Sequence, residues 1–74
     1  MDARKYLVIL EHAEGSNISA YVPDLPGCVS TGPTRDACLR NIREAIAFHI
    51  EGMREDGEAI PEPSSQADYV EAVA

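Results

Sequence analysis

The sequence predicts an α+β domain in which a three-stranded antiparallel sheet is followed by one helix and a final short strand. In the N-terminal half, apolar residues recur with a period of two between turn-forming residues, which is typical of strands and hairpins. In the middle of the chain, apolar residues recur at spacings of three and four, which indicates an amphipathic helix. The expected order is β-β-β-α-β, and a chain of 74 residues is expected to form one domain over residues 1–74.

The first two strands are expected to form a hairpin. The first strand, residues 4–12, places apolar side chains on both of its faces. A helix can cover one face, and a second copy of the chain or a partner can cover the other. Residues 13–16 form the turn, with Gly15 available for a positive φ. Residues 18–22 alternate as a second strand, which ends at Pro23 because proline cannot donate a hydrogen bond to a sheet.

A stiff loop is expected over residues 23–27, which hold two prolines and a glycine, before a short third strand over residues 28–31. Leu25 precedes Pro26 and is therefore pushed towards an extended conformation. One interpretation is a rigid β-turn and nothing more. The other is a contact for a protein partner, because a preorganised loop that offers Leu25 beside Asp24 loses little entropy on binding.

The helix is expected to begin after Thr34, which can serve as the N-cap, with Asp36 in the first turn where the helix dipole favours a negative charge. Gly57 is expected to end it as the residue after the C-cap. The apolar stripe comprises Leu39, Ile42, Ala45, Ile46, His49, Ile50 and Met53. Residues 58–66 are expected to be a crossing loop, and Tyr69, Val70 and Val73 the last strand.

The net charge of −7 bears on possible partners. Most of the acidic surplus lies outside residues 34–55, and no basic stripe is present to neutralise phosphates. Direct binding of nucleic acid is therefore not expected. The acidic field suits a basic protein partner, although it could equally serve solubility alone.

The sequence offers little for catalysis. Cys28 and Cys38 are expected to be free thiols in a reducing compartment. His49 either packs on the sheet or acts as a general base or partner contact. No phosphate-binding motif and no metal-ligand spacing occur, so we expect no enzyme, cofactor or metal. The chain shows no signal peptide and no membrane span, which predicts a cytoplasmic location.

Four motifs occur in order along the chain: YVPDLPGC at 21–28, TGPT at 31–34, NIREAI at 41–46 and DGEAIPEP at 56–63. In this combination the sequence resembles the HicB antitoxin family, from about Tyr6 to Val73. The resemblance implies a partial RNase H-like fold. The sequence shows no carboxylate cluster of the kind that RNase H enzymes use to hold metal ions.

The resemblance also implies a function. HicB proteins neutralise HicA, a small basic mRNA-cleaving ribonuclease, by covering its active surface, and often form dimers or tetramers. The residues expected to contact such a partner are Tyr21, Asp24, Leu25, Pro26 and Cys28. Many HicB proteins carry a further DNA-binding domain after this one. Because the sequence stops at Ala74, operator binding is expected to be absent.

Two alternatives remain. The chain could be a stand-alone HicB-like protein that assembles with itself and has a structural or regulatory role without a toxin. It could also be a metal-dependent nuclease with a residual RNase H-like site.

Overall fold

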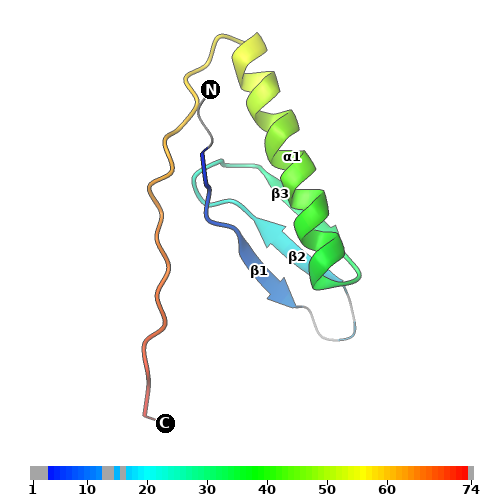
Figure 1. The fold of residues 1–74 in the computed structure, drawn as a ribbon, viewed down its shortest axis with the longest axis vertical. Helices are drawn as coiled ribbons and strands as arrows, with labels where there is room; N and C mark the ends of the chain where they lie inside the picture. The colour runs from blue at the N-terminus through cyan, green and yellow to red at the C-terminus, as the bar shows by residue number, and fades with distance from the viewer. Residues whose placement is uncertain (1–3, 13–14, 16, 74) are drawn as a thin grey trace.

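The computed structural model describes residues 4–12, 15 and 17–73, and in them it contains three strands and one helix (Figure 1). These elements are β1 (Ile9–His12), β2 (Ile18–Tyr21), β3 (Val29–Gly32) and α1 (Arg35–Glu55). The strands form one antiparallel sheet in the order β1-β2-β3, and α1 lies across β3 and β2 (Figure 1). The predicted three-stranded sheet and helix are confirmed.

The first strand is shorter than predicted. β1 pairs with β2 from Ile9 opposite Tyr21 to His12 opposite Ile18, and residues 4–8 continue as extended chain outside the sheet. In this register Val8 would lie opposite Val22 and Leu7 opposite Pro23. The Val22 N–H points away from β1 and donates to the Cys28 carbonyl, and Pro23 has no N–H to donate towards β1. The pairing therefore ends where proline removes the donor.

The hairpin turn is described only at Gly15, whose φ of 67° is the positive value expected there. Ala13, Glu14 and Ser16, which complete the predicted turn, lie outside the described residues.

The core lies between the sheet and α1. Its fully buried members are Ala20, Val22, Leu25, Cys28, Cys38 and Ile42. Half-buried apolar side chains from residues 4–12 and from the predicted helix stripe pack around it. Gly32 allows the sheet and α1 to approach closely, since a Cβ atom there would lie 2.5 Å from the backbone nitrogen of Cys38. The core is thus small and closely packed at the start of the helix.

Both ends of α1 are capped as predicted. The Thr34 side chain accepts a hydrogen bond from the backbone N–H of Ala37 at 3.1 Å. At the other end Gly57 has a φ of 70° and donates to the Arg54 carbonyl at 3.1 Å. The Glu58 N–H donates to the Met53 carbonyl at 2.9 Å, which completes a Schellman motif.

The expected final strand is not confirmed. Residues 58–73 are extended, and among the described residues none of them pairs with a strand. Residues 60–65 are held to the body by side chains, as described below. Residues 66–73, which we call the C-terminal arm, stand clear of the sheet (Figure 1), and Tyr69 is 99% exposed. The arm has the extended shape of a strand but no neighbouring strand to pair with.

Candidate partner-binding surface

The loop over residues 22–28 is folded tightly by its own backbone. The Leu25 N–H donates to the Val22 carbonyl at 3.0 Å, and the Cys28 N–H donates to the Leu25 carbonyl at 3.0 Å. The Val22 N–H closes the loop on the Cys28 carbonyl at 3.1 Å. Gly27 adopts a φ of 86°, which a residue with a side chain rarely adopts. The loop is therefore stiff, as its two prolines predict.

The five residues expected to contact a partner fall into different environments in this loop. Leu25 is 0% exposed and Cys28 is also buried, so both belong to the core. Tyr21 and Pro26 are exposed. A partner that binds the folded loop can reach Tyr21 and Pro26 but not the side chains of Leu25 and Cys28.

Asp24, the fifth of these residues, binds the segment that follows the helix. Its Oδ2 accepts the backbone N–H groups of Ser64 and Ser65, each at 2.9 Å. Its Oδ1 accepts the two serine hydroxyls, at 3.2 Å from Ser64 and 2.7 Å from Ser65. We call this set of four hydrogen bonds the Asp24 clamp.

The Asp24 clamp stabilises the charged carboxylate. The backbone hydrogen bond from Ser65 is the largest cause, followed by the Ser65 hydroxyl and the Ser64 N–H, and together they lower the pKa of Asp24 from 3.8 to about 2. The sequence predicts Asp24 as a partner contact, and it does not predict the hydrogen bonds to Ser64 and Ser65. The available signal was the Ser64-Ser65 pair, whose N–H and O–H donors suit a carboxylate.

The N-terminal segment binds the segment after the helix at a second place, residues 60–62. The Tyr6 hydroxyl donates to the Pro61 carbonyl at 2.6 Å, and the Arg4 guanidinium lies 3.3 Å from the Glu62 carboxylate. Arg4 also donates to the Ile60 carbonyl at 3.2 Å. Residues 60–65 are thus fixed at both ends, and the C-terminal arm begins directly after them.

Neither cysteine has the surroundings of a nucleophile. Both are free and buried, and burial raises the pKa of the Cys28 thiol. The Cys38 thiol donates to the Ile18 carbonyl at 3.4 Å. His49 lies half-buried on α1. Within residues 4–12, 15 and 17–73, no three His, Cys, Asp or Glu side chains lie close enough together to hold a metal ion.

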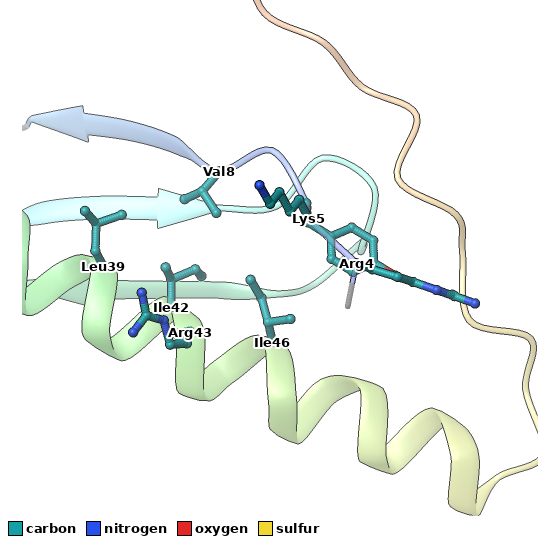
Figure 2. A pocket seen from close by; sticks show the side chains of 8 residues that line it. Arg4, Lys5, Val8, Leu39, Ile42, Arg43 and Ile46 are labelled. Atoms are coloured by element: carbon teal, nitrogen blue, oxygen red, sulfur yellow. The ribbon is translucent and has the colours of Figure 1, made fainter. Parts of the chain in front are cut away.

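An open groove lies between residues 4–8 and α1 (Figure 2). It encloses about 480 Å³, and its apolar side chains are Tyr6, Val8, Leu39, Ile42 and Ile46. The groove is also lined by Arg4, Lys5 and Arg43, three of the six basic residues of this acidic chain. We call it the basic groove. Sequence reasoning missed it because these cations come from two segments that only the fold brings together.

A second surface lies on the outer side of α1. Phe48 is 80% exposed and borders a shallow hollow of about 130 Å³ with Glu51, Gly52 and Glu55. We call this the Phe48 patch. An exposed aromatic ring beside carboxylates suits a cationic side chain, which can stack on the ring and pair with the acids.

In the described part of the chain, no helix has the length and apolarity needed to cross a membrane.

Comparison with known proteins places the chain in a family. Residues 6–74 match the family model described as the HicB_like antitoxin of bacterial toxin-antitoxin systems. A 14.9 kDa protein of Haemophilus phage HP1 is 49% identical over 49 residues, which are 66% of this chain and 37% of the phage protein. A UPF0150 protein of Thermoplasma acidophilum is 38% identical over 68 residues, which are 92% of this chain and 99% of that protein.

Solved structures agree with this match. The crystal structure of the Burkholderia pseudomallei antitoxin HicB superposes with a TM-score of 0.73 at 36% identity, over 82% of this chain and 46% of HicB. A structure of the HicA3 and HicB3 toxin-antitoxin complex superposes with a TM-score of 0.68 at 31% identity, over 82% of this chain and 70% of that one. The chain therefore spans less than half the length of the phage protein and of B. pseudomallei HicB. From the family match, the shared sheet-and-helix fold and these structures together, the chain belongs to the HicB-like antitoxin family.

Proposed function

We propose that this protein is an antitoxin that binds and neutralises a small basic HicA-type toxin that cleaves mRNA. The observation that carries the proposal is the similarity to a chain from the HicA3 and HicB3 complex, over 82% of this chain. In this proposal residues 1–74 act as one domain in the cytoplasm, without catalytic activity or nucleic-acid binding of their own.

Charge supports a basic partner. The net charge of −7 produces a negative field that attracts a cationic protein and repels RNA. The antitoxin would therefore compete with RNA for the toxin's basic surface without binding RNA itself.

Two surfaces are available for the contact. The first is the exposed part of the 22–28 loop, namely Pro26 with the adjoining Tyr21, on a stiff backbone that loses little entropy on binding. The second is the Phe48 patch, whose aromatic ring and two carboxylates suit an arginine or lysine of the toxin.

Co-expression tests the proposal. The protein is produced together with a small basic HicA-type protein, taken from the reading frame beside its gene if that frame encodes one, and growth and complex formation are measured. We expect relief of growth arrest and a stable complex. Growth arrest without a complex would refute the antitoxin role.

Two variants test the contact surfaces. Replacing Phe48 by Ala, or both Glu51 and Glu55 by Lys, should weaken the complex if the Phe48 patch is used. The matched control reverses the charges of Glu11 and Glu58, which are exposed and lie outside the patch, so that the net charge changes equally. Equal binding by the patch variant and the control would leave the 22–28 loop as the contact surface.

Self-assembly into a dimer or tetramer is a second candidate function, favoured by the exposed apolar side chains of the C-terminal arm. It is compatible with toxin binding. Sedimentation of the purified protein measures it directly, and a stable monomer would argue against it.

A further inference from the structure

We propose that the C-terminal arm of one copy binds in the basic groove of a second copy, and that two copies exchange arms reciprocally. The inference rests on the proposed self-association and is independent of the toxin. It assigns an occupant to the basic groove and a binding site to the arm.

The arm exposes apolar surface that the single chain leaves uncovered. Tyr69, Val70 and Val73 are 99%, 89% and 101% exposed, and no backbone-to-backbone hydrogen bond joins the described part of the arm to the sheet. Removing large apolar side chains from water lowers the free energy of the system. An extended segment of this kind is suited to dock in a groove.

The groove and the arm are complementary in polarity and in charge. The groove combines apolar side chains with basic ones, and Lys5 and Arg43 are both exposed (Figure 2). The arm combines apolar side chains with acidic ones, since Asp68 and Glu71 lie among its apolar residues. A nucleic acid would match the cations but leave the apolar side chains uncovered. An acidic, apolar, extended peptide matches both.

The geometry of the single chain favours an arm from a second copy. The Asp24 clamp holds Ser64 and Ser65 on the 22–28 loop, so the arm starts from a fixed point outside the groove. From there it runs clear of the sheet (Figure 1), and none of residues 66–73 is among the residues that line the groove of its own chain. Before this point, residues 60–62 of the same chain contact two residues that line the groove, Arg4 and Tyr6.

Exchange of arms gives a closed assembly. If the arm of one copy fills the groove of the other, a two-fold axis makes the second arm fill the first groove. Both exposed arms and both grooves are then covered. The Asp24 clamp keeps Ser64 and Ser65, directly before the arm, ordered before binding. Less conformational entropy is therefore lost on association.

A charge swap between two variants tests the exchange. The arm variant carries Asp68→Lys and Glu71→Lys, and the groove variant carries Lys5→Glu and Arg43→Glu; all four positions are exposed, so the fold should persist. Each variant alone would place like charges at both contacts of a homodimer. In an equimolar mixture, each contact of the heterodimer instead joins an arm and a groove of opposite charge.

We expect wild-type protein to self-associate and each variant alone to do so roughly tenfold more weakly or worse. The mixture should form a 1:1 heterodimer in sedimentation and native mass spectrometry. A Glu11→Lys, Glu58→Lys variant is the control for net charge and should associate more tightly than the arm variant. Circular dichroism checks that every variant is folded.

Three outcomes would overturn the inference. They are a wild type that stays monomeric at about 1 mM, variants that associate as the wild type does, and a mixture without heterodimers. Toxin neutralisation is measured separately, so a failed exchange with a working antitoxin removes only this inference. A failed antitoxin with a working exchange removes only the toxin partner.

Discussion

At the scale of single residues, Leu25 is a core residue that lies within a turn-rich loop. Its place between Asp24 and Pro26 in a turn-rich segment made it a candidate partner contact, yet it is fully buried. Proline and glycine indicate where a chain turns, but they do not indicate which way the side chain between them points. The loop here turns inward, and Leu25 joins the core.

Replacing Leu25 by Ala should therefore destabilise the fold, by about 2–5 kcal/mol, because it removes buried methyl groups and leaves a cavity. In a chain this short, that loss is comparable to the whole free energy of unfolding. Urea denaturation followed by circular dichroism measures it. The control is Val29→Ala at a position that is 64% exposed, with an expected cost below about 1 kcal/mol. Equal midpoints for wild type and Leu25→Ala would contradict the burial.

The lowered pKa of Asp24 predicts that the binding of Ser64 and Ser65 to its carboxylate depends on pH. Its pKa is lowered from 3.8 to about 2 in the folded chain, so the hydrogen bonds of the Asp24 clamp contribute fully above about pH 4. Their contribution is lost as the pH falls from about 4 to about 2, because the carboxylate is then protonated. The protection factors of the Ser64 and Ser65 amides, which compare the observed exchange rate with the intrinsic rate at the same pH, should therefore fall over this range. Asp24→Asn should show fast exchange already at pH 6, whereas Glu11→Gln should behave as the wild type does.

At the scale of elements, the contact between β3 and α1 depends on the lack of a side chain at Gly32. A Cβ atom there would lie 2.5 Å and 2.8 Å from the N and Cα atoms of Cys38, which are backbone atoms that cannot move away alone. Gly32→Ala should cost about 1–3 kcal/mol through overpacking. Gly52→Ala is the contrasting variant, because Gly52 lies inside α1 with open space around it and should gain about 0.5–1 kcal/mol in stability. Urea titrations of both variants measure whether the free energy of unfolding falls for Gly32→Ala and rises for Gly52→Ala. A Gly32→Ala protein as stable as wild type would contradict the close approach of β3 to α1.

Elements with strong local signals could be predicted from the sequence. α1 followed from its apolar spacing, and its ends followed from Thr34 and Gly57, because each cap depends on neighbouring residues only. The same was true of the three strands, although the register shortened the first at Pro23. The Asp24 clamp joins positions 40 residues apart, and the basic groove combines residues 4–8 with α1. Such contacts carry no local periodicity, so they could not be predicted in this way.

At the scale of the whole molecule, the chain combines a small core with two uncovered features. Among the described residues, the buried core contains six apolar residues, while the arm and the basic groove both leave apolar surface open to solvent. A short chain buries a low fraction of its surface, so association with a partner can supply part of its stability. Toxin binding and arm exchange would each cover different parts of this surface.

The net charge of −7 makes a prediction about how fast a basic partner binds. The screening length is about 30 Å at 0.01 M salt and about 8 Å at 0.15 M, so the field of the whole chain reaches the partner only at low salt. The association rate constant with a HicA-type toxin should fall by about tenfold or more across this range, while the dissociation rate constant, which reflects short-range contacts, should change little.

Stopped-flow kinetics measures the association rate constant, and displacement by excess unlabelled antitoxin measures the dissociation rate constant. Reversing the charges of Glu11 and Glu58 changes the net charge from −7 to −3 and should flatten the salt dependence without altering dissociation. An association rate that is independent of salt would show that the acidic surface does not guide binding, and that its role is confined to keeping the chain in solution.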